Sequence, residues 1–285
     1  MSEFRSLLFA LFQLVFTPVY AVLVLLMFWL PPIARFKFII VWCGTNLLAA
    51  RWICGIRHRV IGAENIPRSS DPHIVMSKHS STWETLALNF LFPPLAFVAK
   101  KELLSIPFFG WAFALASPIT IDRKSGLDAM TQIITQSRER FAQGFWIVIY
   151  PEGTRIKAGT RAHYKTGGAR LAVALGVPIV PVAHNAGYLW PKGRLGKRPG
   201  TITVSIGPPI SVEGHDMQRL INEVEAWIEY WKAVQYAEVA EKGLIAAQAR
   251  VRDAADDAGV VEKALIAAQA RVRDTADDAE VAQRN

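Results

Sequence analysis

Apolar side chains dominate the amino-terminal part of the chain. From Ser6 to Ala34 no residue is charged, and these 29 residues would extend about 43 Å as a helix, against roughly 30 Å of bilayer hydrocarbon. Pro31-Pro32 ends this run, and a second uncharged run of 13 residues follows from Phe38 to Ala50. The pattern predicts two apolar helices within residues 1–54 that anchor the protein to a membrane. Because the second run is shorter than the ~20 residues of a full span, crossing twice and entering one leaflet both stay open.

A cleaved signal peptide is the competing interpretation of the first run. The run is longer than the 7–15-residue apolar segment of such peptides, and no small-residue cleavage site precedes a polar start. We therefore interpret the segment as an anchor.

Beyond the anchor, short β-rich apolar runs alternate with helical stretches over residues 55–237. This alternation predicts an α/β fold, a mixed sheet covered by helices. In such sheets, residues just beyond the carboxyl ends of strands are favoured for chemistry. The predicted strands are Arg57–Ile61, His73–Ser77, Leu95–Ala99, Pro118–Ile121, Phe145–Ile149, Pro178–Val182 and Thr201–Ile206, and the predicted helices are Glu84–Leu91, Gly126–Gln143 and Gly167–Leu175.

Residues 238–285 form a third segment, which contains an internal repeat. Glu241–Ala258 recurs as Glu262–Ala279 with a displacement of 21 residues, or three heptads. The repeat predicts a heptad-repeat helical tail whose apolar seam is mostly alanine, which gives a weak coiled coil. Self-association through this tail and a solvated helix without a partner are both open.

Charge is unevenly spread along the chain. The net charge is +8, but residues 238–285 hold 7 Lys/Arg and 10 Asp/Glu, which leaves 25 and 14, or +11, on residues 1–237. A basic body beside an apolar anchor suits a bilayer with anionic lipids. Nucleic acid is not an expected partner, because no helix-turn-helix, zinc-finger or aromatic RNA-binding signature accompanies the charge.

The two cysteines, Cys43 and Cys54, lie in or beside the second apolar run. They support neither a disulfide framework nor a metal site, and we expect them to be packing residues. With no sign of an oxidising compartment, we expect the catalytic domain on the cytoplasmic face of the inner membrane.

The run from Lys78 to Glu84 carries the first candidate chemistry. His79 offers a proton acceptor, and Glu84, five residues later, can orient it if His79 stands in the turn before a helix. Ser81 and Glu84 also fit a capping box, in which Glu84 would only bond the Ser81 backbone. Further ligands at zinc-like spacing are lacking, so no metal is expected. Motifs for a serine or cysteine nucleophile are absent, so a substrate hydroxyl would attack directly.

Cations follow two later strands. Arg123 comes two residues after the strand Pro118–Ile121, and Arg155 lies in the turn Tyr150–Arg155 after the strand Phe145–Ile149. Arginine suits bidentate binding of phosphate, and a structural ion pair between Glu152 and Arg155 is the alternative. Lys100, Lys101 and Lys165 are weaker candidates for the same role.

These residues resemble four ordered blocks of the glycerolipid acyltransferases, closest to the 1-acyl-sn-glycerol-3-phosphate acyltransferase branch. The blocks are His79-x4-Glu84, Gly110–Arg123, Tyr150–Arg155 and Val177–Ala183, and the likeness covers roughly residues 55–215. Glu84 stands where the family more often has Asp, Tyr150 replaces the commoner Phe, and the repeated tail lies outside the family pattern.

The resemblance implies an acyltransferase that moves an acyl chain from acyl-CoA or acyl carrier protein to the hydroxyl of lysophosphatidate, without a metal or organic cofactor. It implies His79 as the base, Glu84 as its partner and Arg123 and Arg155 as phosphate binders. Within the third block, it implies that Glu152, Gly153 and Thr154 contact or position the substrate.

Three questions stay open at this point. The acceptor could be glycerol 3-phosphate, a lysophospholipid or a lyso-ornithine lipid. The protein could also be a non-catalytic membrane scaffold that acts through its heptad tail. The apolar segment Glu102–Ser117 could line an acyl channel, lie at the lipid interface or belong to the core.

Overall fold

The computed structural model describes residues 2–69, 71–122, 128–193 and 195–255. Two compact units divide the chain, residues 1–232 and 233–285, and helix α8 (Met217–Ala255) runs from the first into the second. The helix includes part of the first tail repeat, whereas residues 256–285 lie outside the described residues. The heptad seam, the tail's self-association and the domain boundaries at 54/55 and 237/238 therefore stay predictions.

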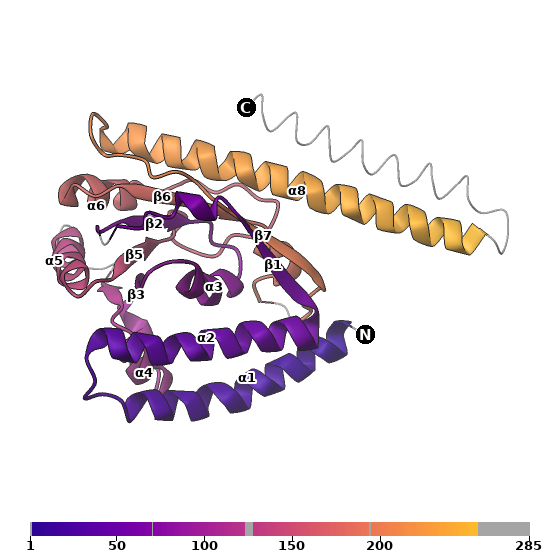
Figure 1. The fold of residues 1–285 in the computed structure, drawn as a ribbon, viewed down its shortest axis with the longest axis horizontal. Coiled ribbons are helices and arrows are strands. Elements are labelled where there is room, and N and C mark those ends of the chain that lie inside the picture. The colour runs from indigo at the N-terminus through magenta and orange to yellow at the C-terminus, as the bar shows by residue number, and fades with distance from the viewer. Residues whose placement is uncertain (1, 70, 123–127, 194, 256–285) are drawn as a thin grey trace. The chain divides into compact units, whose positions relative to one another are not determined.

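One seven-stranded sheet, in the order β1-β7-β6-β2-β5-β3-β4, organises the first unit (Figure 1). The five strands from β6 to β4 run parallel, β7 pairs antiparallel with β6, and β1 runs parallel to β7. The predicted mixed sheet is confirmed, and each predicted strand is present. The strands are β1 Ile56–Ile61, β2 Ile74–Ser77, β3 Leu95–Lys100, β4 Ile119–Ile121, β5 Trp146–Ile149, β6 Ile179–His184 and β7 Gly200–Ile206.

The central strands are buried on both faces, which explains their unbroken apolar sequence. Val75 of β2 packs in one apolar cluster with helices α2 and α3, whereas Ile74 and Met76 pack in a second cluster with α5, α6 and α8. Helices therefore cover both faces of the sheet (Figure 1). Besides α8, the helices after the amino-terminal pair are η1 Ala63–Asn65, α3 Trp83–Leu91, η2 Lys101–Ser105, α4 Phe109–Leu115, α5 Asp128–Ala142, α6 Gly167–Leu175 and α7 Ala186–Leu189.

The predicted pair of apolar helices is present as α1 (Ser2–Leu25) and α2 (Pro32–Cys54). Helix α2 has 23 residues, ten more than the uncharged run, because it continues through charged residues at both ends. Pro32 occupies its first turn, and Gly55 in the left-handed conformation ends it, as is common at helix ends. Both helices are long and apolar enough to be candidate membrane spans.

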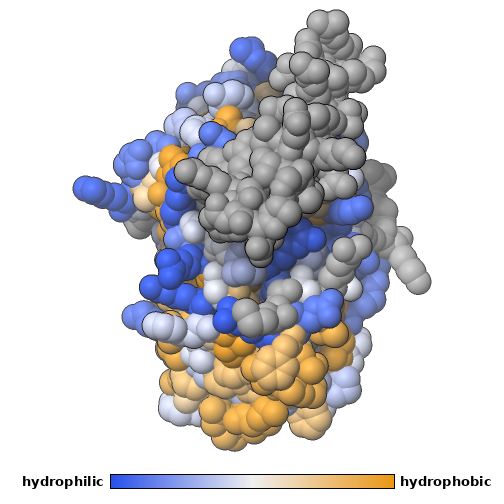
Figure 2. All heavy atoms as spheres, turned by 90° about the vertical axis from the view of Figure 1, so that its right-hand side faces the viewer, coloured by the Kyte–Doolittle hydropathy of each residue, from blue (hydrophilic) through white to orange (hydrophobic). Residues whose placement is uncertain are grey.

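Large apolar side chains stay exposed on these two helices, on the connection between them and on α4. Leu14, Phe28, Trp29 and Trp52 are about two-thirds exposed or more, and Trp111 of α4 is half exposed. In the space-filling view, apolar surface gathers at the lower end, where α1, α2 and α4 lie, and a hydrophilic zone borders it (Figure 2). A contiguous apolar surface of this kind marks a contact with lipid or protein.

Candidate active site

His79 stands in the short connection between β2 and α3, at the carboxyl edge of the parallel strands. Its carbonyl accepts a hydrogen bond from the Ile156 amide at 2.8 Å, which ties this connection to the segment after β5. Its ring folds back over the start of α3, so that Nδ1 lies 3.0 Å from Glu84 Oε1. The local geometry that the spacing of five requires is therefore present.

Glu84 is fully buried, and its Oε1 has two further donors. The amides of Ser80 and Ser81 donate to this oxygen at 2.8 and 2.7 Å. Burial by itself would raise the pKa of Glu84, but the two nearby histidines, His184 and His79, and the Ser81 amide together hold it below its usual value. The capping and orienting roles, left as alternatives by the sequence, are thus combined on one carboxylate oxygen.

An ionised carboxylate can only accept hydrogen bonds, so the contact with Glu84 assigns the proton of His79 to Nδ1. Nε2 is then left with a lone pair, as a general base requires. The ring of Tyr150 stacks on the imidazole, with centroids 3.8 Å apart and planes 11° from parallel. This stacking fixes the plane of the imidazole, and the side chain of His79 is 17% exposed, which leaves it within reach of a substrate.

A second histidine, His184 at the end of β6, lies behind Glu84. Its Nε2 is 3.9 Å from Glu84 Oε2 and donates to the Lys78 carbonyl at 2.8 Å, while its Nδ1 accepts the Ala186 amide at 3.3 Å. One donating and one accepting nitrogen describe a neutral imidazole. Burial lowers the pKa of His184, opposed by the Glu84 carboxylate, which agrees with that state.

Glu152 is buried and does not pair with Arg155. Its Oε1 lies 2.8 Å from the Lys78 ammonium and accepts the His79 amide at 3.3 Å. The structural ion pair within the Tyr150–Arg155 turn, considered as an alternative, is therefore replaced by a pair with Lys78. Glu152 links this turn directly to the backbone of His79.

Arg155 is exposed and faces the start of α3, where its Nη1 donates to Thr82 Oγ1 at 2.9 Å. Gly153 adopts a positive φ of 69°, and a Cβ there would lie 3.0 Å from Lys165 Nζ, so Lys165 stands over the same turn. Thr154, between Gly153 and Arg155 in the sequence, is exposed. The fold thus brings Gly153, Thr154, Arg155 and Lys165 beside the His79 connection.

Lys100 and Lys101 stand at the end of β3 and the start of η2, and both are exposed. Because β3 is parallel to β5, this end lies at the same edge of the sheet as the Tyr150–Arg155 turn. Arg123 lies outside the described residues. Within the described residues, no group of three or more His, Cys, Asp and Glu side chains is placed to hold a metal ion.

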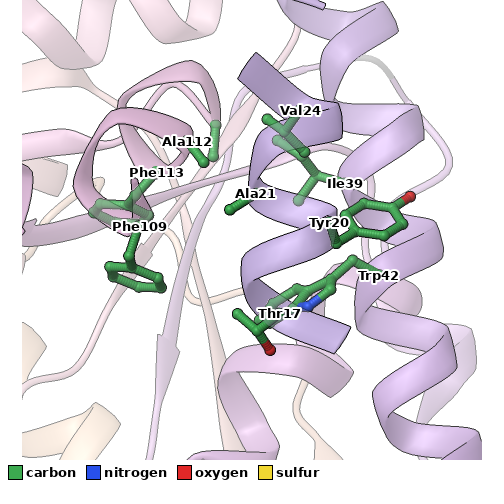
Figure 3. A pocket seen from close by; sticks show the side chains of 10 residues that line it. Thr17, Tyr20, Ala21, Val24, Ile39, Trp42, Phe109, Ala112 and Phe113 are labelled. Carbon is green, nitrogen blue, oxygen red and sulfur yellow. The ribbon is translucent and has the colours of Figure 1, made fainter. Parts of the chain in front are cut away.

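The apolar segment Glu102–Ser117 includes α4, which packs against the amino-terminal helices. Phe109 and Phe113 face α1 and α2 across a cavity of about 80 Å³ (Figure 3). This volume is well below the roughly 300–1,000 Å³ of typical small-molecule sites. Phe108 and Trp111 on the same segment are about half exposed. The arrangement favours the lipid-interface interpretation of this segment over an acyl channel.

Sequence reasoning missed three side chains of this site: Lys78, Tyr150 and His184. Lys78 directly precedes the block that begins at His79, Tyr150 is the first residue of the block Tyr150–Arg155, and His184 directly follows the block Val177–Ala183. Adjacency to a motif at a strand end was the available signal. It could not show which of these side chains turns inward.

Comparisons with known proteins show which family this chain resembles. The family model described as Acyltransferase matches residues 57–185. The chain is 43% identical over 244 residues to the 1-acyl-sn-glycerol-3-phosphate acyltransferase of Pseudomonas aeruginosa, covering 84% of this chain and 94% of that protein. It is 34% identical over 171 residues to the alpha form of that enzyme in Mus musculus, covering 59% of this chain and 60% of that protein.

A solved structure with the same fold is the crystal structure of the 1-acyl-sn-glycerophosphate (LPA) acyltransferase PlsC from Thermotoga maritima. The TM-score is 0.69 at 26% sequence identity, and the match covers 83% of this chain and 98% of that one. The likeness therefore extends beyond the sheet to most of the first unit. Together with the 43% identity along nearly the whole Pseudomonas protein, it shows that this chain belongs to the 1-acyl-sn-glycerol-3-phosphate acyltransferase family of acyltransferases.

Proposed function

We propose that the protein transfers an acyl chain from a thioester carrier to the sn-2 hydroxyl of 1-acyl-sn-glycerol 3-phosphate, forming phosphatidate. The observation that carries this proposal is the His79–Glu84 contact of 3.0 Å, which leaves Nε2 as a base beside exposed Arg155. The family membership supports the same reaction.

The proposed reaction needs one base and no covalent enzyme intermediate. His79 Nε2 takes the proton of the acceptor hydroxyl as its oxygen attacks the thioester carbonyl. When the C–S bond of the resulting tetrahedral intermediate breaks, the imidazolium returns this proton to the departing thiolate. The Glu84 carboxylate stabilises the imidazolium between the two proton transfers. Overall, one C–O ester bond forms, the C–S bond of the thioester breaks, and the carrier leaves as a free thiol.

Arg155 and Lys165 are proposed to bind the acceptor phosphate, with Gly153 and Thr154 supplying the turn that carries Arg155. Arg123, Lys100 and Lys101 are proposed as further cations around the same phosphate. Glu152 is proposed to position the substrate indirectly, because its buried carboxylate holds the His79 backbone.

A direct assay tests the acceptor and the donor together. Purified protein in detergent is incubated with acyl-CoA or acyl carrier protein thioester and with labelled lysophosphatidate, glycerol 3-phosphate, lysophosphatidylcholine or lyso-ornithine lipid. We expect lysophosphatidate to be acylated fastest. Faster acylation of another acceptor would overturn the proposal, and the ratio of the two donors identifies the carrier.

Arg155→Ala is expected to raise the KM for lysophosphatidate by about 10- to 100-fold with little change in kcat. A hydrogen bond to a charged group contributes about 1.5–3 kcal/mol, which corresponds to a factor of this size. Steady-state kinetics with varied acceptor measures the effect. Arg170→Ala, on the exposed side of α6, is the matched control and should leave KM unchanged. An unchanged KM in Arg155→Ala would mean that this guanidinium does not bind the acceptor.

The amino-terminal helices are proposed to lie within the cytoplasmic leaflet of the inner membrane rather than to cross it. Helix α2 packs against the α/β domain along most of its length, with buried Phe36 and Cys43 in its first half and Ala50 and Cys54 near its end. Phe36 contacts Phe145, the residue before β5, and Asn89 of α3 donates to Cys43 Sγ. A spanning α2 would draw this domain into hydrocarbon, where its polar groups lose water.

Cysteine labelling separates the two topologies. Trp29 lies in the connection between α1 and α2, and Leu195 is an exposed residue of the α/β domain. Both native cysteines are buried, so a membrane-impermeant maleimide should report on an introduced one. We expect Trp29→Cys and Leu195→Cys to be labelled from the same, cytoplasmic side of sealed vesicles. Labelling of Trp29→Cys from the opposite side would establish that α1 spans the bilayer.

A further inference from the structure

The side chain of Lys78 is buried beside the active site. It is 1% exposed, and its ammonium lies 2.8 Å from Glu152 Oε1 and 3.1 Å from Glu229 Oε1. Lysine is almost never fully buried unless it is paired, because removing its charge from water is costly. We propose that Lys78 is a positioning residue for acyl transfer, which holds the His79 connection in place through Glu152 and helix α8. This inference rests on the proposed function, because the reaction that Lys78 would affect is the proposed acyl transfer.

Lys78 acts on His79 through a shared acceptor. Glu152 Oε1 receives both the Lys78 ammonium and the His79 amide, the latter at 3.3 Å. If the ammonium is removed, the buried Glu152 carboxylate has no cation and must take up a proton or move. Either change alters the acceptor that fixes the His79 backbone. The Lys78 carbonyl also accepts from His184, so the backbone of the same residue is held from the other side.

Helix α8, distant in the sequence, supplies the second carboxylate that pairs with Lys78. Leu220, Val224 and Ile228 are buried at helical spacing and seat this part of α8 on the sheet. Glu229, the next residue, is thereby directed at Lys78, 151 positions earlier. Its carboxylate also accepts the Tyr164 hydroxyl at 3.2 Å and contacts Lys232. The two carboxylates and two ammonium groups of this cluster balance in charge.

The burial of Lys78 decides which kinetic constant it affects. An ammonium enclosed by Glu152 and Glu229 cannot bind the acceptor or the donor, so substrate affinity should not depend on it. The position of the base relative to the hydroxyl should depend on it, and a misplacement of about 1 Å can cost about 10²-fold in rate. The expected signature is therefore a lower kcat at nearly constant KM.

The test compares full-length wild type, Lys78→Met, Glu229→Gln and Glu225→Gln, each purified in detergent and checked for folding by circular dichroism. Glu225 is the matched control, because it lies one turn before Glu229 on α8 and pairs with exposed Arg161. We expect kcat to fall about 100-fold in Lys78→Met and about 10-fold in Glu229→Gln, with KM for lysophosphatidate and for the donor within about threefold of wild type. Glu225→Gln should stay within about twofold in both constants.

Two results would overturn the inference. The first is a folded Lys78→Met whose kcat stays within about threefold of wild type, or whose loss lies in KM. The second applies if Lys78→Met does not fold: it is a Glu229→Gln variant whose kcat equals that of the control Glu225→Gln. A wild type that does not acylate lysophosphatidate refutes the proposed function instead, and the same variants are then compared on the acceptor that is acylated.

Discussion

His79→Ala is expected to lower kcat for acyl transfer by about 10²–10⁴-fold, the usual contribution of a general base, while the fold is retained. The imidazole is held by Glu84 at 3.0 Å and by the stacked Tyr150 ring, and its loss leaves the acceptor hydroxyl without a proton acceptor. Because the side chain is partly exposed, its removal opens no large cavity in the core. Initial rates with lysophosphatidate and saturating donor measure the effect.

His215→Ala provides the matched control for this experiment. His215 lies before α8 and pairs with Glu223 at 3.0 Å, away from the His79 connection in the sequence and in its contacts. Its removal should change kcat by less than about twofold. If purified, folded His79→Ala turned over at nearly the wild-type rate, the base would have to be another group.

Glu84→Gln is expected to lower kcat by about 10²-fold or more and to destabilise the protein. The amide keeps the size of the side chain but removes the charge that stabilises the His79 imidazolium. It also makes the acceptor of the hydrogen bonds from His79, Ser80 and Ser81 a neutral oxygen, and it places a buried NH2 group at the position of Oε2, beside His184. A hydrogen bond to a charged group contributes about 1.5–3 kcal/mol and a neutral one about 0.5–1.5 kcal/mol, so chemical denaturation should show a loss of stability of at least about 1 kcal/mol.

The pH dependence of stability gives a second readout for Glu84. Its pKa is lower in the folded protein than its ordinary value, so its ionised form contributes stability above the unfolded-state pKa of about 4.3. This contribution is lost as the pH falls through the folded-state pKa. The difference in free energy of unfolding between wild type and Glu84→Gln should therefore be full at neutral pH and shrink below about pH 4.

Two further variants complete this comparison. Glu64→Gln changes an exposed carboxylate and should alter neither activity nor the acid limb of stability. Glu84→Asp keeps the charge with one methylene fewer and should retain more activity than Glu84→Gln. If Glu84→Gln were as active as Glu64→Gln, the His79–Glu84 contact would have only a capping role.

Local sequence determined the elements of this fold and the place of its chemistry. The central strands are unbroken apolar runs because both faces of a parallel sheet are covered, so burial is visible in composition alone. Proline and glycine marked the ends of α2, since Pro32 suits a first turn and Gly55 the left-handed conformation at a helix end. The polar blocks followed strand ends, which predicted that His79 and Arg155 would lie at one edge of the sheet.

Other features depend on partners that are distant in the sequence. The uncharged run Phe38–Ala50 indicates that α2 is apolar, but only the tertiary structure shows that the α/β domain covers it at positions from Phe36 to Cys54. The proposal that α1 and α2 lie within one leaflet rests on that contact and not on the length of the two helices. In the same way, the identity of Tyr150 says nothing about the imidazole on which it stacks.

The sequence by itself predicted the strands, the two apolar amino-terminal helices and the main helices of the α/β domain, and it offered the pairing of His79 with Glu84 as one of two alternatives, because each of these depends on residues that are close together in the chain. Only the tertiary structure decided that Lys78 is buried, that Glu152 pairs with it, and that His184 and Glu229 complete its surroundings. The physical reason is that a buried charge is stable only when its partners are supplied at the same place. Those partners come from β6, α8 and the turn after β5, which meet only when the chain is folded.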